Sequence, residues 1–185
     1  MKMTSILTTL VALTLTFQAC SKEDVVEETN NMVATNEYVL TAINKQQFVI
    51  KKEQDGFILE NAKGKVIIFD IFATWCPPCR AEASHLSSLQ KKYKDELVII
   101  GITIEDGIQN QKLQSFREEY NAQYTLVNSP QNRRIINEIA STLKVGKRFP
   151  IPLMAMYKDG KLINHYLGAT EEEFIESDIK KALGK

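Results

Sequence analysis

The sequence predicts an α/β domain with a mixed β-sheet, because strand and helix patterns alternate along the chain and the last strands form a hairpin. Two nearly continuous apolar runs, Val66–Phe72 and Leu97–Ile104, are typical of central strands that are covered on both faces. Between them, Pro77–Tyr93 carries apolar residues at helical spacing, which predicts a connecting helix. Near the C-terminus, Asp159-Gly160 is a strong hairpin-turn pair between two further apolar runs.

The domain opens with short β-like runs that are separated by polar turns at Asn44-Lys45 and Asp55-Gly56. These three runs are Tyr38–Ile43, Phe48–Lys51 and Phe57–Leu59. We therefore expect a small β-structure ahead of the first central strand.

The second half of the domain continues the alternation of helices and strands. After the second central strand, the pattern predicts a helix, a short strand and another helix at Gln111–Tyr120, Tyr124–Val127 and Ile135–Leu143. The closing hairpin pairs Leu153–Tyr157 with Leu162–Leu167. Thr170 and Glu173 have the spacing of a capping box, which predicts the start of the last helix.

The composition narrows the classes of function. The chain has 185 residues, of which 44% are hydrophobic and 25% are charged, as in ordinary globular proteins. Lys+Arg and Asp+Glu both number 23, so the formal net charge of zero gives no electrostatic support for nucleic-acid binding. The chain has 3 cysteines, too few for a disulfide scaffold.

Residues 1–20 have the pattern of an export signal. Lys2 precedes an apolar stretch, Ile6–Phe17, that is too short to cross a hydrocarbon core, which needs about 20 residues. Cys20 directly follows the small residue Ala19, as at a bacterial lipoprotein processing site, so we expect lipidation of Cys20. A buried N-terminal helix is the alternative. Residues 21–37 are then a flexible acidic tether, and residues 38–185 form a domain held at the periplasmic or extracytoplasmic face of a membrane.

The segment with the clearest chemistry is Cys76-Pro77-Pro78-Cys79, placed where a buried strand meets a helix. Two cysteines three residues apart at a helix start can form a disulfide, because one helical turn brings their side chains together. We expect Cys76 to face solvent at the positive end of the helix dipole, which stabilises a nucleophilic thiolate. Cys79, one turn further, is suited to resolve a mixed disulfide.

The two prolines carry a further expectation. Pro77 and Pro78 lack N–H groups, so neither can donate a hydrogen bond to the sulfur of Cys76, and the amide of Cys79 is the nearest donor that remains. Fewer donors stabilise the thiolate less, which favours a reducing dithiol.

Two alternatives to redox chemistry are weaker. The Cys-x-x-Cys pair could be half of a zinc site, but the sequence has no second cysteine pair. His85 and His165 are the only histidines in the sequence, so no metal site is predicted. A purely structural disulfide across so small a loop constrains little of the unfolded chain.

The segment Phe69–Arg80 resembles the active-site segment of thioredoxin-fold proteins. Together with the export signal, it makes the chain similar to the TlpA/ResA-type membrane-tethered thiol–disulfide oxidoreductases, from Tyr38 to the C-terminus. The resemblance implies a thioredoxin-like fold, with a central mixed β-sheet flanked by helices and an N-terminal β-hairpin extension. It also implies a protein-disulfide oxidoreductase with no cofactor beyond the redox-active disulfide Cys76–Cys79.

The resemblance assigns two acids to the site. Asp70 stands six residues before Cys76, where thioredoxins carry a buried acid and many TlpA-type proteins carry asparagine; burial would raise its pKa and make it a base for Cys79 through water. The alternative is an aspartate satisfied by backbone. Glu82 matches an acid of ResA-like proteins and lies on the apolar helix stripe, where it either extends to solvent or tunes the pKa values of the cysteines.

Pro152 resembles the cis-proline that faces the cysteine pair in this fold, with Pro150 as the competing position. A cis bond at Pro152 would expose the backbone of Ile151 for pairing with an extended substrate segment. Trp75 would pack beside Cys76 and shape an apolar docking surface, unless it belongs to the core.

The implied function is reduction of disulfides in other exported proteins, with apocytochrome c as one substrate class. The protein would act as a monomer, recharged by a membrane electron donor of the CcdA/DsbD type. One alternative is a DsbA-type oxidase, although the chain lacks room for the large helical insertion of those enzymes. A second is a Sco-like copper-delivery module, whose cysteines have a wider spacing. A peroxidase is excluded, because Ala73 stands where the expected threonine would be.

Overall fold

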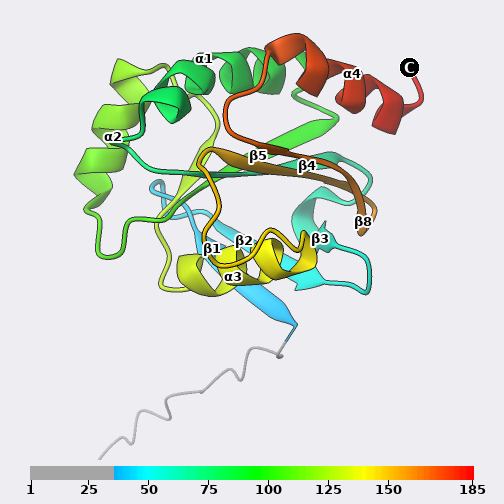
Figure 1. Cartoon of the computed structure of the whole chain (residues 1–185), viewed down its shortest axis with the longest axis horizontal. Coiled ribbons are helices and arrows are strands. Elements are labelled where there is room, and N and C mark those ends of the chain that lie inside the picture. The colour runs from blue at the N-terminus through cyan, green and yellow to red at the C-terminus, as the bar shows by residue number, and fades with distance from the viewer. Residues whose placement is uncertain (1–35) are drawn as a thin grey trace, which may run out of the picture. The chain divides into compact units, whose positions relative to one another are not determined.

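The computed structural model describes residues 36–185 (Figure 1). The expected export signal, the lipidation site at Cys20 and the tether up to residue 35 lie outside the described residues. The first strand, β1, begins at Glu37, one residue before the boundary expected from the sequence. Within residues 36–185, helices are too short or too polar to cross a membrane.

The centre of the domain is a five-stranded mixed sheet with the strand order β6-β5-β4-β7-β8. Parallel pairing joins β4 to β5 and β5 to β6, whereas β7 pairs antiparallel with β4 and β8. These strands span Val66–Phe72 (β4), Leu97–Thr103 (β5), Thr125–Val127 (β6), Leu153–Lys158 (β7) and Lys161–Leu167 (β8). The expected mixed sheet and its closing hairpin are confirmed.

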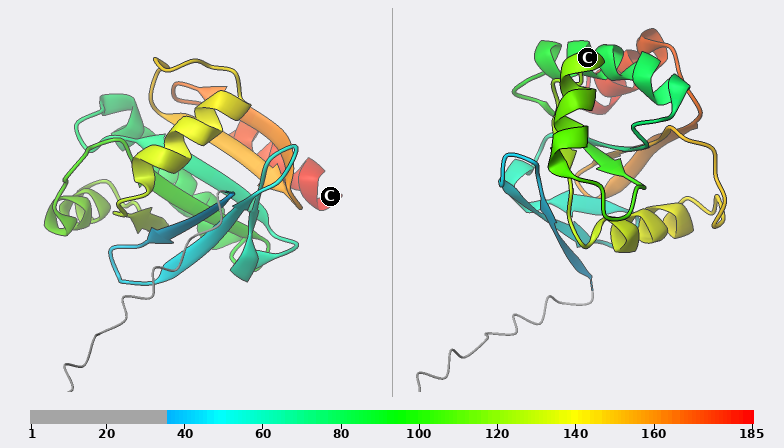
Figure 2. Two further views of the ribbon diagram at one scale, coloured as in Figure 1. Left: turned by 90° about the horizontal axis from the view of Figure 1, so that it is seen from below. Right: turned by 90° about the vertical axis from the view of Figure 1, so that its left-hand side faces the viewer.

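Helices cover both faces of this sheet (Figure 1). They span Pro77–Lys92 (α1), Asn110–Glu119 (α2), Asn132–Thr142 (α3) and Glu172–Leu183 (α4). One hydrophobic core joins the sheet to α1, α2 and α4, and a second joins its other face to α3 and the N-terminal strands. The right-hand view in Figure 2 shows the same layers from the side, so the domain has a thioredoxin-like arrangement.

Alternation along β4 decides which side chains meet α1. Ile67, Phe69 and Ile71 belong to the core on the α3 side, whereas Val66, Ile68 and Phe72 belong to the core on the α1 side. Asp70 has the parity of the second set, so its carboxyl lies on the same face of the sheet as the helix that carries the cysteines.

The N-terminal extension is a three-stranded antiparallel sheet rather than a hairpin. Its strands are β1 (Glu37–Thr41), β2 (Gln47–Lys52) and β3 (Phe57–Leu59), in the order β1-β2-β3. The expected hairpin corresponds to β1 and β2, and the third β-like run expected from the sequence, Phe57–Leu59, forms β3, with Phe57 opposite Lys52. A short 3₁₀ turn, Glu60–Ala62, leads on to β4.

The expected capping box at α4 is wrong. The helix begins one residue later than expected, with Glu171 at its N-cap and without a side-chain capping bond. The backbone N–H of Thr170 instead donates to the Glu82 carboxylate at 2.9 Å, so a tertiary contact replaces the local one.

Gly101 in β5 leaves the space that Tyr124 occupies. A Cβ atom built on Gly101 would lie 2.9 Å from Leu126 Cδ2, 2.9 Å from Tyr124 Cε2 and 3.2 Å from Phe72 Cε1. Gly101 pairs with Asp70 in β4. Because Gly101 has no side chain, the Tyr124 ring has room to reach the Asp70 carboxyl.

We expect Gly101→Ala to destabilise the fold by about 1–3 kcal/mol, because the added methyl overpacks a buried contact. Urea unfolding should show a lower midpoint with an unchanged slope. Ser115 on α2 is exposed and provides a control, because Ser115→Ala should change stability by no more than about 0.5 kcal/mol. An unchanged midpoint for Gly101→Ala would contradict the packing described.

Candidate active site

The two cysteines lie at the start of α1, shortly after the end of β4. Cys76 is the N-cap of α1, the prolines occupy the next two positions, and a disulfide joins Cys76 to Cys79 with a Cα–Cα distance of 5.3 Å. The amide of Cys79 donates to Cys76 Sγ at 3.3 Å. Prolines are tolerated here because the first helical amides have no acceptor within the helix.

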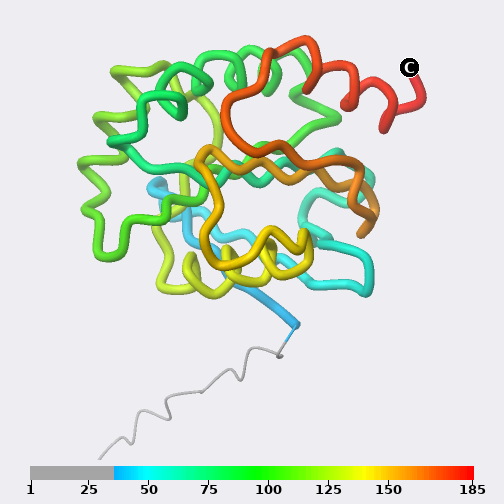
Figure 3. Tube along the Cα trace, viewed as in Figure 1, coloured from blue at the N-terminus to red at the C-terminus, as the bar shows by residue number. Residues whose placement is uncertain are grey.

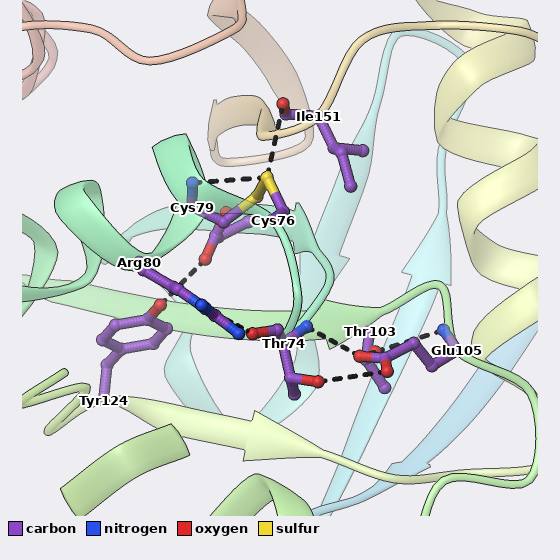
Figure 4. Close-up of a disulfide and its surroundings, with 9 residues drawn as sticks. Thr74, Cys76, Cys79, Arg80, Thr103, Glu105, Tyr124 and Ile151 are labelled. Carbon is purple, nitrogen blue, oxygen red and sulfur yellow. Dashed lines mark hydrogen bonds between the residues drawn. A yellow bond between two sulfur atoms is a disulfide. The ribbon is translucent and has the colours of Figure 1, made fainter. Parts of the chain in front are cut away.

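The expectation that Cys76 faces solvent is wrong for this disulfide form. Cys76 is 2% exposed and Cys79 is 3% exposed, and both join the core on the α1 side. The carbonyl oxygen of Ile151 lies 3.6 Å from Cys76 Sγ and covers it from the opposite loop (Figure 4). Trp75 is 56% exposed, so the alternative that it belongs to the core is also wrong.

The loop that faces the disulfide carries a cis peptide bond. Within residues 36–185 this bond is Ile151–Pro152, so Pro150 is not the cis-proline. The tube in Figure 3 follows the chain from α3 through this loop into β7. The carbonyl of Pro152 accepts from the amide of Gly168 at 2.8 Å, which ties the loop to the end of β8.

Asp70 is a buried acid held by one side chain. It is 3% exposed, and its Oδ2 accepts a hydrogen bond from the Tyr124 hydroxyl at 2.9 Å. Its Oδ1 has no hydrogen-bond partner among the described residues, so backbone does not satisfy this carboxyl. Burial raises the pKa of Asp70 to about 7, and the bond from Tyr124 opposes that rise.

Glu82 is the second buried acid, 2% exposed, so it does not extend to solvent. Its Oε1 accepts from the Thr170 amide, and its Oε2 has no partner among the described residues. Burial, and then the negative charge of Asp70, raise the pKa of Glu82 to about 8, while the bond from Thr170 works in the opposite direction. The two acids therefore form an electrostatically coupled pair that retains a proton near neutral pH.

Tyr124 was not predicted as a site residue. Its pKa is raised by burial and by the charge of Asp70, so its hydroxyl stays protonated and donates to that carboxyl. Figure 4 shows the hydroxyl pointing toward the cysteine pair. The residue directly precedes β6, which lies two strands away from β4, and its sequence neighbourhood is that of an ordinary short strand.

A polar cluster around Thr74 was also not predicted. Both the amide and the hydroxyl of Thr74 donate to the Glu105 carboxylate, and its carbonyl accepts from Arg80 Nε at 2.7 Å (Figure 4). The Arg80 guanidinium also lies over the Tyr120 ring, 5.1 Å from its centroid. An acid just after a buried parallel strand is the sequence signal that could have indicated Glu105.

Neither histidine approaches a metal-binding geometry with the cysteines. Among residues 36–185, no group of three or more histidine, cysteine or acidic side chains could hold a metal ion. His85 lies on α1, and His165 lies on β8. The site holds a buried disulfide together with two buried carboxyls, those of Asp70 and Glu82.

The buried acid makes stability depend on pH. Because the pKa of Asp70 rises from 3.8 to about 7 on folding, the folded state binds its proton more tightly than the unfolded chain. The contribution of Asp70 to stability is therefore full below its unfolded-state pKa of 3.8, and it is lost as the pH rises through its folded-state pKa of about 7. We expect the free energy of unfolding of the wild type to fall on the order of 2–4 kcal/mol more than that of Asp70→Asn over this range.

Urea unfolding of the oxidised protein at a series of pH values measures this difference. Asp55 is exposed, and Asp55→Asn should keep the wild-type pH dependence. Parallel curves for the wild type and Asp70→Asn would mean that Asp70 does not titrate as described.

Comparison with known proteins agrees with this geometry. Residues 33–152 match the model of the AhpC/TSA family. Thiol-disulfide oxidoreductase ResA of Bacillus thuringiensis (strain Al Hakam) is 28% identical over 149 residues, which cover 75% of this chain and 81% of ResA.

Two solved structures show the same fold. A thiol:disulfide interchange protein of the thioredoxin family from Chlorobium tepidum TLS superposes with a TM-score of 0.64 at 20% identity, covering 80% of this chain and 94% of that one. The pneumococcal exposed lipoprotein thioredoxin Etrx1 from Streptococcus pneumoniae strain TIGR4 has a TM-score of 0.57 at 18% identity, covering 78% and 98%. The chain belongs to the AhpC/TSA family and is a thioredoxin-fold thiol–disulfide oxidoreductase of the ResA type.

Proposed function

We propose that this oxidoreductase works in the reducing direction on disulfides of other exported proteins. The observation that carries the proposal is the number of donors at Cys76 Sγ. A sulfur at an N-cap can accept from the amides of the second and third helical residues, but here the second is Pro78. Among the described residues, the Cys79 amide is the one backbone donor to that sulfur.

This shortage of donors sets the direction of electron flow. A thiolate that receives few hydrogen bonds is stabilised less, so the reduced form of the dithiol is favoured less. The dithiol then gives up its electrons readily to a substrate disulfide. The buried carboxyls of Asp70 and Glu82 support the same direction. A thiolate near them would place negative charge in a region where water cannot solvate it well.

The reaction is a two-step exchange. The Cys76 thiolate attacks one sulfur of the substrate disulfide, forming a mixed disulfide and releasing the other sulfur as a thiolate that takes up a proton. Cys79 then loses its proton, with Asp70 as the acceptor through water, and attacks Cys76 Sγ. The second substrate thiol leaves, and the Cys76–Cys79 disulfide forms. The substrate gains two electrons from the dithiol. A membrane donor of the CcdA/DsbD type then supplies two electrons that reduce the Cys76–Cys79 disulfide again.

The proposed substrates are extended segments of exported polypeptides, the haem-site cysteines of apocytochrome c among them. The backbone of Ile151 beside Cys76 offers an edge for pairing, and the exposed Trp75 ring offers apolar contact. The proposed location is the extracytoplasmic face of a membrane, with lipid on Cys20 as the anchor and the protein acting as a monomer. The name of the pneumococcal relative, an exposed lipoprotein thioredoxin, is in keeping with that location.

Trapping the intermediate tests the proposed substrates. Cys79→Ser removes the resolving thiol, so mixed disulfides should accumulate on Cys76 in cells and should be released by reductant. Mass spectrometry would identify the partners, and apocytochrome c among them would support the narrower proposal. Cys76→Ser is the control and should trap no partner. If the trapped proteins are cytoplasmic, or if no partner is trapped, the proposed role is wrong.

The donor argument predicts the effect of restoring an amide. Pro78→Ala supplies an N–H at the second helical position, so the Cys76 pKa should fall and the reduction potential should rise by about 30 mV, equivalent to about 1.4 kcal/mol. Equilibration with a glutathione redox buffer measures the potential. Pro130 is exposed and lies ahead of α3, and Pro130→Ala should leave the potential unchanged. A wild-type potential near the DsbA value of about −120 mV would refute the reducing direction.

A further inference from the structure

The pairing of β4 with β5 brings Thr74 and Glu105 together. The two strands are parallel, and the last pair in register is Phe72 with Thr103. Thr74 and Glu105 each stand two residues beyond that pair, at the same edge of the sheet. A parallel register therefore makes them neighbours, although they are far apart in the sequence.

The Glu105 carboxylate binds both donors of Thr74. The Thr74 amide donates to Oε2 at 2.7 Å, and the Thr74 hydroxyl donates to Oε1 at 3.1 Å. The carboxylate is itself oriented by the Thr103 hydroxyl, which donates to Oε2 at 3.3 Å, and by Lys112 Nζ, 2.9 Å from Oε1. Burial opposes ionisation, but the bonds from Lys112 and Thr74 outweigh it and lower the pKa of Glu105, so the group is charged at neutral pH.

The third polar group of Thr74 is fixed as well. Its carbonyl accepts from Arg80 Nε at 2.7 Å, and Arg80 comes from the first turn of α1. The backbone of Thr74 is therefore held on both sides, two residues before Cys76. Any rotation of this loop would move the sulfur relative to the Cys79 amide and the Ile151 carbonyl, both of which contact it.

We propose that Glu105 is a positioning residue that holds the loop Thr74–Cys76 so that Cys76 Sγ stays aligned with the Cys79 amide and with an incoming disulfide. Glu105 does not touch the sulfurs and takes no part in the exchange itself. Its contribution is the geometry of attack, which is sensitive to displacements of about 1 Å. The inference concerns the reactivity of Cys76 and holds for any substrate of the dithiol.

Two substitutions separate the hydrogen bonds of Glu105 from its charge. Glu105→Gln removes the charge but keeps an amide oxygen that can accept from the Thr74 N–H, whereas Glu105→Ala removes both. Because both variants lose the charge, the difference between them measures positioning alone. We expect Glu105→Ala to reduce a small peptide disulfide about tenfold more slowly than Glu105→Gln, as for the loss of a hydrogen bond to a charged or buried group.

The pH profile of alkylation gives a second readout that a general loss of stability would not change. Iodoacetamide labelling of the reduced protein should show a higher Cys76 pKa in Glu105→Ala than in Glu105→Gln, because the sulfur loses its alignment with the Cys79 amide. Equal rates and equal pKa values for the two variants would overturn the proposal.

Glu138 offers a matched control pair. It is an acid on α3 that pairs with Lys52 at 2.7 Å, away from the disulfide, so Glu138→Ala and Glu138→Gln should have equal rates. If Glu105→Ala does not fold, Thr74 decides the question. Thr74→Val removes the hydroxyl bond and should slow reduction about threefold, while Thr74→Ser should keep the wild-type rate. Equal rates for those two variants would overturn the proposal.

Because the readouts are a model disulfide and alkylation, they do not depend on the proposed cellular role. The proposal on Glu105 can fail while mixed disulfides with exported proteins are still trapped, and the reverse outcome is equally distinguishable.

Discussion

The parallel pairing of β4 with β5 is the constraint on which the site depends. Its register places Asp70 opposite Gly101, and the missing side chain there leaves room for the Tyr124 ring to reach the Asp70 carboxyl. The same register ends both strands together, so that the loop leading to Cys76 runs beside the loop that carries Glu105. One ladder of backbone hydrogen bonds thus fixes both the buried acid and the polar cluster beside the loop that leads to Cys76.

The local part of this arrangement could be predicted from the sequence. The apolar run Val66–Phe72 has the bounds of β4, and the Cys-Pro-Pro-Cys spacing at a helix start leads directly to the disulfide. Asp70 could be placed on a buried strand, because the residues on both sides of it are apolar. These predictions succeed because each depends on periodicity or on a spacing within one helical turn.

What could not be predicted depends on contacts between distant segments. Tyr124 and Asp70 are 54 residues apart, and Thr74 and Glu105 are 31 apart, so no local pattern connects them.

The capping box at Thr170 failed for a related reason, since the Thr170 amide binds Glu82 on another helix. The exposure of Cys76 was predicted from its place at a helix end, but the loop through Ile151 covers that end.

Charge around the disulfide explains why these distant contacts matter for the chemistry. The prolines withhold donors from Cys76, and Glu105 is an anion beside its loop. Among residues 36–185, the Cys79 amide is the one backbone donor to the Cys76 sulfur, and the helix dipole adds to its effect. Asp70 and Glu82 are buried with one unpartnered oxygen each among the described residues, and their raised pKa values keep a proton available at neutral pH. A second negative charge is therefore costly throughout the site. Forming the Cys76–Cys79 disulfide removes the two ionisable thiols, and this relief of charge is the physical basis of the reducing direction proposed above.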